Sequence, residues 1–117
     1  MPGRVLIVDD HASFRAAARA MLEADGFEVV GEAADGIGAL VACVRLEPAV
    51  VLLDIQMPDL DGFAVAERLS KQRRPPQVVL VSNRSAAGYR RRLAGAPVHG
   101  FLTKAELSSE SLATMLR

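Results

Sequence analysis

Short apolar runs alternate with amphipathic stretches along this chain. The apolar runs are rich in β-branched and aliphatic residues, which is the composition of buried strands. They predict five strands, at residues 4–8, 27–31, 49–53, 77–81 and 98–102. In the stretches that follow each run, apolar residues recur at helical spacing. These stretches predict five helices, at residues 12–24, 35–47, 61–72, 85–93 and 105–116.

Turn-forming and capping residues mark several of these boundaries. Gly26 follows the first helix at a position where glycine favours helix termination, and Asp35 is the expected N-cap of the second helix. Pro75 and Pro76 separate the third helix from the fourth strand. The second helix carries a stripe of aliphatic side chains that we expect to face the core. This stripe consists of Ile37, Leu40, Val41 and Val44.

Strands that alternate with helices indicate βα units, in which the strands run parallel and helices cover the sheet. The runs at 49–53 and 77–81 are apolar throughout, as strands covered on both faces are, so we place them with 4–8 in the middle of the sheet. The run at 27–31 alternates and is expected at an edge. The pattern predicts one α/β domain over residues 1–117, with a doubly wound, five-stranded parallel sheet of order 2-1-3-4-5, the flavodoxin-like arrangement.

The composition limits the classes of protein to which this chain can belong. Its 117 residues fit a single domain, and no apolar run approaches the roughly 20 residues of a membrane span. Cys43 is the single cysteine, which excludes an internal disulfide framework and a cysteine-rich metal site. We therefore expect a cytoplasmic protein with no membrane partner.

The formal net charge is zero, but the charges are divided unevenly along the chain. Residues 1–67 contain twelve acidic and four basic residues, whereas residues 68–117 contain two acidic and ten basic residues. A basic surface can bind nucleic acid, but this one lacks interleaved aromatic residues and an identifiable recognition helix. We therefore interpret the run Arg90–Arg92, with Tyr89 before it, as a solvated helix face, with a protein-partner surface as the alternative. We expect no direct nucleic-acid binding by this domain.

Polar residues stand at the carboxyl ends of four of the predicted strands. They are Asp9 and Asp10 after the first strand, Asp54 after the third, Ser82 after the fourth and Lys104 after the fifth. Because the strands are parallel, these side chains should meet at one edge of the sheet, where doubly wound folds bind their ligands.

This combination of side chains indicates phosphoryl chemistry. Three neighbouring carboxylates repel one another unless a cation lies between them, and Mg²⁺ prefers oxygen ligands of this kind. An ammonium group and a hydroxyl group suit phosphoryl oxygens, and an aspartate can itself form an acyl phosphate. The set therefore implies metal-assisted phosphoryl transfer to Asp54.

Four segments extend this set into a pattern that resembles a known family. The segments are Val8–His11, Leu52–Gly62, Val81–Ser82 and Gly100–Lys104. In this order and at βα spacing they resemble the receiver domain of response regulators from bacterial two-component signalling, also called the CheY-like fold. The similarity spans essentially the whole chain. The start Asp9-Asp10-His11 and the end Gly100–Leu107 further resemble receivers of the NarL/FixJ type, which usually precede a helix-turn-helix domain.

The resemblance implies a site for one Mg²⁺ ion, formed by four residues. Asp54 matches the phosphoacceptor, which also contacts the metal. Asp10 matches the carboxylate that binds Mg²⁺ directly, and Asp9 matches its partner, which acts largely through water. Gln56 matches the residue whose backbone carbonyl completes the protein ligands.

The resemblance also implies residues that respond to the phosphoryl group. Ser82 matches the hydroxyl residue that moves toward it, and Lys104 matches the lysine that pairs with it. Phe101 matches the aromatic residue whose rotamer follows activation. Gln56 and Arg84 occupy positions that tune dephosphorylation in this family.

The function implied by the resemblance is a phosphorylation-controlled switch rather than an enzyme. Asp54 would accept a phosphoryl group from a sensor histidine kinase, and the chain would catalyse only its own phosphotransfer and dephosphorylation. The surface formed by residues 85–93, 98–102 and 105–116 would then change and regulate a downstream protein or a helix-turn-helix output domain. We expect no output domain within these 117 residues. A homodimer that forms on phosphorylation is also compatible with the resemblance.

Two alternative functions stay open from the sequence. An Mg²⁺-dependent aspartyl-phosphate phosphatase would need a second acid two residues after the nucleophile, where this chain has Gln56. A receiver-like binding module that is not phosphorylated would not need the complete set of edge residues. The chain departs from the family at Ala105, where receivers commonly have a proline after the lysine, often across a cis bond. A cis bond before a non-proline residue costs about 3 kcal/mol, so the sequence leaves the isomer of the Lys104–Ala105 bond open.

Overall fold

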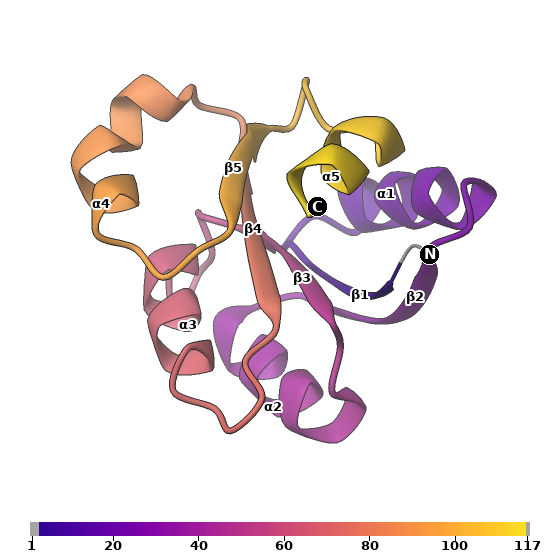
Figure 1. The fold of residues 1–117 in the computed structure, drawn as a ribbon, viewed down its shortest axis with the longest axis horizontal. Coiled ribbons are helices and arrows are strands. Elements are labelled where there is room, and N and C mark those ends of the chain that lie inside the picture. The colour runs from indigo at the N-terminus through magenta and orange to yellow at the C-terminus, as the bar shows by residue number, and fades with distance from the viewer. Residues whose placement is uncertain (1–2, 117) are drawn as a thin grey trace.

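The computed structural model describes residues 3–116 and contains a five-stranded parallel sheet (Figure 1). The strands are β1 (Arg4–Val8), β2 (Glu28–Ala33), β3 (Val50–Asp54), β4 (Gln77–Ser82) and β5 (Gly100–Thr103). Their order is β2-β1-β3-β4-β5, and every neighbouring pair is parallel. The predicted doubly wound sheet is therefore confirmed, with β2 at one edge.

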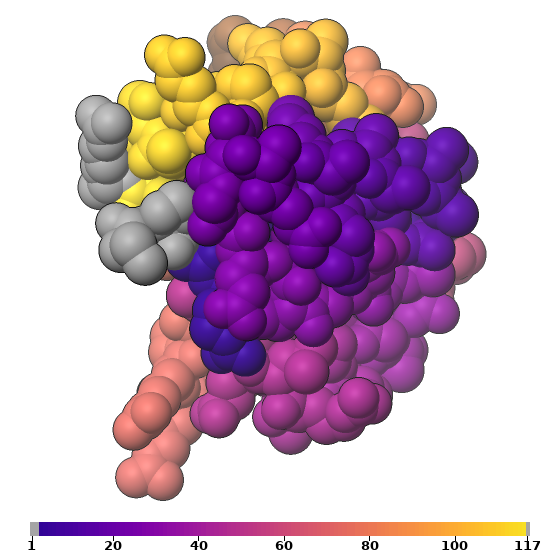
Figure 2. All heavy atoms as spheres, turned by 90° about the vertical axis from the view of Figure 1, so that its right-hand side faces the viewer, coloured from indigo at the N-terminus to yellow at the C-terminus, as the bar shows by residue number. Residues whose placement is uncertain are grey.

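Helices cover both faces of the sheet (Figure 1). They are α1 (Ala12–Ala24), α2 (Gly36–Leu46), α3 (Gly62–Leu69), the 3₁₀ helix η1 (Ala86–Tyr89), α4 (Arg90–Ala94) and α5 (Ser109–Met115). The helices α1 and α5 lie side by side on one face (Figure 2), where the Ser109 hydroxyl donates to the Met21 carbonyl at 3.3 Å. The helices α2, α3 and α4 cover the other face. Within residues 3–116, no helix combines the length and the apolar character needed to cross a bilayer.

The two faces explain why the central strands are apolar throughout. In β1, Leu6 and Val8 pack on the α2–α3 side, whereas Val5 and Ile7 pack on the α1–α5 side. The same alternation continues in β3 and β4, where every residue from Val78 to Ser82 is buried. Because side chains of a strand point alternately to its two faces, a strand between two helical layers needs apolar residues at each position.

The stripe that we expected α2 to bury is largely on the outside. Ile37, Val41 and Val44 are 53, 52 and 71% exposed, whereas Ala39 and Cys43 are buried. The helix turns its small residues toward the sheet because it lies close to it. A Cβ atom at Gly31 of β2 would stand 2.7 Å from the Leu46 side chain.

Two helices near the C-terminus differ from the expected ranges. The fourth is divided into η1 and the five-residue α4. The last begins at Ser109, four residues later than expected, because Ser108 forms a capping box with Ser111. The intervening turn is held by Glu106, whose carboxylate accepts hydrogen bonds from the backbone and hydroxyl of Thr103 at 3.1 and 2.8 Å. No peptide bond within residues 3–116 is cis, so the Lys104–Ala105 bond is trans.

Gly62 has a steric role at the start of α3. A Cβ atom at this position would lie 2.6 Å from the Asp54 carbonyl oxygen and 2.9 Å from the Ile55 Cα atom, and the Gly62 amide donates to the Ile55 carbonyl at 2.8 Å.

We predict that Gly62→Ala lowers the free energy of unfolding by about 1–3 kcal/mol, because backbone atoms would have to move. Urea denaturation measures this change. The control is Gly95→Ala, where a Cβ atom meets nothing within 4 Å. Equal losses in both variants would contradict the prediction.

Candidate functional site

The structure brings the predicted edge residues together at the carboxyl ends of the strands. Asp9 follows β1, Asp54 ends β3 and Ser82 ends β4, and their exposed fractions are only 0, 4 and 1%. Asp10 lies beside them with an exposed side chain. Carboxylate oxygens of Asp9, Asp10 and Asp54, together with a ring nitrogen of His11, all lie within 4.8 Å of one another.

Lys104 supplies the positive charge within this cluster. Its Nζ atom lies 2.5 Å from Asp9 Oδ2 and 3.8 Å from Asp54 Oδ2, and it also lies 4.3 Å above the centre of the Phe14 ring. Only 13% of the lysine side chain is exposed. The resemblance assigned Lys104 to a phosphoryl group on Asp54, and in this structure its nearest carboxylate is that of Asp9. This pairing is favourable because the Asp9 carboxylate is fully buried.

His11 is a hydrogen-bonding neighbour of the acidic pair. Its backbone amide donates to Asp9 Oδ1 at 2.8 Å, and its Nδ1 atom lies 3.1 Å from an oxygen of Asp9 and 3.1 Å from one of Asp10. The imidazole is 63% exposed. The ring therefore stands at the outer side of the cluster.

The environment of Asp54 opposes its ionisation. Burial raises the pKa of this carboxyl group from 3.8 to about 6, and the nearby Asp9 charge adds to this effect. The Lys104 charge and a long hydrogen bond from the Gln56 amide, at 3.4 Å, act in the opposite direction on the pKa. A cluster of carboxylate oxygens with unfavourable mutual repulsion fits a hard divalent cation.

The loop after β3 is braced against α2. The two carboxylate oxygens of Asp59 accept hydrogen bonds from the backbone amides of Gly36 and Ile37 at 2.8 and 2.9 Å. These bonds lower the pKa of Asp59 to about 2. The loop carrying Gln56 is therefore held to α2 through Asp59, and its two ends are joined by the hydrogen bond from the Gly62 amide to the Ile55 carbonyl.

Ser82 contacts Tyr89, which we expected on a solvated helix face. The Ser82 hydroxyl lies 3.2 Å from the Tyr89 hydroxyl and accepts a hydrogen bond from the Arg84 amide at 3.1 Å. Tyr89 is only 8% exposed, so assigning it to a solvated helix face was wrong. Its aromatic character, within a segment otherwise rich in arginine and alanine, was the available signal.

A hollow of about 560 Å³ opens beside the acidic cluster. Its walls include Asp10, Gln56, Arg84, Tyr89 and Arg92. The two positions that the resemblance associates with dephosphorylation, Gln56 and Arg84, therefore border one space. Arg92, which the sequence analysis did not single out for this site, donates to Asp61 Oδ2 at 2.6 Å and covers the Phe63 ring at 4.2 Å.

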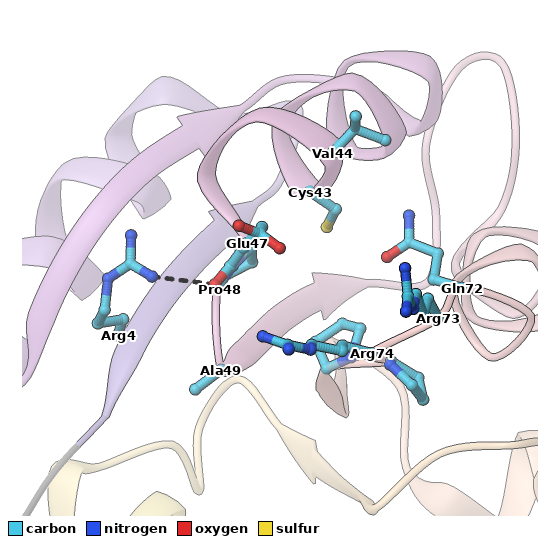
Figure 3. Close-up of a pocket in the computed structure, with 11 residues that line it drawn as sticks. Arg4, Cys43, Val44, Glu47, Pro48, Ala49, Gln72, Arg73 and Arg74 are labelled. Atoms are coloured by element: carbon cyan, nitrogen blue, oxygen red, sulfur yellow. Dashed lines mark hydrogen bonds between the residues drawn. The ribbon is translucent and has the colours of Figure 1, made fainter.

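Figure 3 shows a second hollow, of about 890 Å³, near the amino ends of β3 and β4. Arg4 lies at its margin and donates to the Leu46 and Glu47 carbonyls at 2.8 and 3.0 Å, which caps α2. Burial raises the pKa of the Cys43 thiol in its wall to about 11, so this thiol is protonated at neutral pH. The hollow lies at the opposite end of the sheet from the carboxylate cluster.

Comparisons with known proteins identify the family. The sequence model described as the response regulator receiver domain matches residues 5–117. The chain belongs to the response regulator receiver domain family. The receiver is also similar to a structure described as the signal receiver domain of a NarL response regulator from Mycobacterium tuberculosis. That similarity has a TM-score of 0.86 and 32% identity, over 98% of this chain and 97% of that one.

Its curated relatives include transcription regulators. The receiver is 38% identical over 106 residues to the virulence-factor transcription regulator BvgA of Bordetella pertussis. The match covers 91% of this chain and 51% of BvgA. The receiver thus spans about half the length of the transcription regulators that it matches.

Other relatives are enzymes. The receiver is 47% identical over 83 residues to a protein-glutamate methylesterase/protein-glutamine glutaminase of Myxococcus xanthus, covering 70% of this chain but 24% of that protein. The matched segment is therefore about a quarter of that enzyme's length.

The raised pKa of Asp54 predicts that ionisation of this group lowers the stability of the folded state. In chelator-treated protein, wild type should lose stability relative to Asp54→Asn as pH rises from about 4 to 6, because the unfolded chain ionises Asp54 at 3.8 and the folded chain at about 6. Above pH 7 the variant should be more stable by roughly 1–3 kcal/mol. Urea denaturation at a series of pH values measures the difference. A variant that is less stable than wild type at pH 7.5 would contradict the assigned pKa.

Proposed function

We propose that this receiver is a cytoplasmic phosphorylation switch, with residues 1–117 acting as one unit and Asp54 accepting the phosphoryl group. The observation that carries the proposal is the buried Asp54 carboxylate between two acidic residues and one lysine, at the edge of the sheet. A carboxylate held in this way is available as a nucleophile and has a cation beside it. The proposed phosphodonor is a phosphohistidine of a sensor kinase.

The donor set suits Mg²⁺. Asp9, Asp10 and Asp54 would hold the ion together with the backbone carbonyl of Gln56. When bound, Mg²⁺ supplies positive charge to the carboxylates and to the phosphoryl oxygens during transfer. The three carboxylates of the cluster offer oxygen ligands, and their mutual repulsion favours a bound cation, although the cluster also includes a ring nitrogen of His11 at its outer side.

In the proposed reaction, one residue of the chain is the nucleophile and two others bind the phosphoryl oxygens. An Asp54 carboxylate oxygen attacks the phosphorus atom, the bond from phosphorus to the donor nitrogen breaks, and an acyl phosphate forms on Asp54. The displaced imidazole of the donor leaves with the bonding electrons and takes up a proton. Lys104, already 3.8 Å from Asp54, pairs with a phosphoryl oxygen, and the Ser82 hydroxyl donates to another.

The proposed output is a change in the surface formed by α4, β5 and α5. Ser82 ends β4, with three residues between it and η1, and Lys104 begins the turn that leads to α5, so groups that respond at the site are continuous with this surface. Phe101 of β5 packs near Tyr89, with ring centres 6.1 Å apart. The partner would be a downstream protein or a helix-turn-helix output domain, as the similarity to transcription regulators suggests. A homodimer of the phosphorylated form is a further candidate.

Gln56 and Arg84 are proposed to set the lifetime of the phosphoryl group. Both border the hollow from which water would reach Asp54. An arginine side chain over this opening would slow hydrolysis by excluding water from the acyl phosphate.

Intact-mass measurement tests the phosphoacceptor directly. After incubation with acetyl phosphate and Mg²⁺, the wild-type chain should gain one phosphoryl group, and chelation of the metal should prevent the gain. Asp54→Asn should gain none, because the nucleophile is lost. Asp25→Asn, an exposed change at the end of α1, is the matched control and should behave as wild type. A phosphoryl group on Asp54→Asn, or none on wild type, would refute the assignment.

A further inference from the structure

The Ser82 hydroxyl is held by the segment that follows it. Within residues 3–116, its hydrogen-bond partners are the Arg84 amide at 3.1 Å and the Tyr89 hydroxyl at 3.2 Å. No hydrogen bond joins this hydroxyl to Asp54 or Lys104 in the part of the chain that the structure describes. The Ser82 hydroxyl therefore bonds to two residues that follow β4, Arg84 and Tyr89, rather than to the proposed phosphoacceptor.

The donors and acceptors of this hydroxyl are few. A serine hydroxyl has one proton and two lone pairs, and the Arg84 amide already donates to one lone pair. The Tyr89 hydroxyl bonds to Ser82 alone among the described residues. Either hydroxyl can be the donor in this bond. When Ser82 donates, the bond uses the only serine proton, which the proposed phosphoryl contact also needs.

The ring of Tyr89 is wedged between two other aromatic rings. Its centre lies 5.9 Å from that of Phe63 in α3 and 6.1 Å from that of Phe101 in β5. Tyr89 ends η1 and directly precedes α4. The hydrogen bond between Ser82 and Tyr89 therefore connects the site with the beginning of α4 and with Phe101.

We infer that Tyr89 is a positioning residue that holds the Ser82 hydroxyl away from Asp54 until Asp54 is phosphorylated. The inference rests on the proposed function. A phosphoryl oxygen offers Ser82 a charge-assisted hydrogen bond, which is stronger than a bond between two neutral hydroxyls. Ser82 then donates its proton to the phosphoryl group, and Tyr89 loses its partner. The start of α4 is released from β4 at this step.

Phosphorylation kinetics test the inference through Tyr89→Phe, which removes one oxygen and keeps the ring. With acetyl phosphate and Mg²⁺, Tyr89→Phe should gain its phosphoryl group roughly fivefold faster than wild type, as expected for the loss of one competing hydrogen bond. In a Ser82→Ala background the same change should have no effect, because the competing bond is already absent. Ser85→Ala removes a hydroxyl that makes no capping hydrogen bond in the same segment, and it is the matched control.

The fluorescence of Tyr89 gives a second, spectroscopic readout. The chain has one tyrosine and no tryptophan, so its tyrosine emission comes from Tyr89 alone. Emission should change on phosphorylation of the wild type, and it should already differ in unphosphorylated Ser82→Ala. In Ser82→Ala, phosphorylation should leave the emission unchanged, because the bond that would break is already absent. A bond with a purely structural role would persist on phosphorylation, so the emission of the wild type would then stay constant.

The outcomes separate the inference from the proposed function. A wild type that takes up no phosphoryl group overturns the proposed function, and this inference falls with it. If the wild type is phosphorylated while Tyr89→Phe gains the group at the same rate or more slowly, the inference alone is overturned. The same holds if the emission of Tyr89 is unchanged by phosphorylation.

Discussion

The burial of Asp9 and Asp54 beside a single lysine is the constraint on which the rest of this structure depends. Two carboxylates that are almost fully buried repel each other, and one ammonium group cannot neutralise both. The parallel sheet creates this situation because β1 and β3 are neighbours and both end at the same edge. The site thus combines buried negative charges that are not fully neutralised with a sheet that is otherwise apolar. Such a site responds strongly to any added cation or phosphoryl group.

The sheet and the edge residues could be predicted because their physical signals are local. Strands covered on both faces have no polar residues except at their ends, and the transition from an apolar run to aspartate or serine marks where β1, β3 and β4 end. Asp9, Asp54 and Ser82 were placed by this reasoning alone. The parallel direction of the strands then brings together residues that are far apart in the sequence.

The face that α2 buries could not be predicted because the helix is apolar almost all round. Periodicity indicates which face of the helix carries the large side chains. The distance between the helix and the sheet determines which of its faces can pack against the sheet. Ala39 and Cys43 face inward because a close approach leaves room only for small side chains, and Val44 is left outside. Tyr89 was misplaced for a related reason. Its partner Ser82 lies on another element, and no pattern within residues 85–93 reveals that contact.

The bracing of the loop after β3 by Asp59 has a mechanical consequence. On that side, the acidic cluster is bordered by backbone tied to α2 through two short hydrogen bonds and packed tightly at Gly62. On the other side, the segment after β4 is tied to the site through hydrogen bonds of the Ser82 hydroxyl with the Arg84 amide and the Tyr89 hydroxyl. The site is therefore held more firmly on the side of the loop after β3 than on the side of the segment after β4. A new charge at the centre of the site would displace mainly the segment after β4, so the fold itself sets the direction of the conformational change.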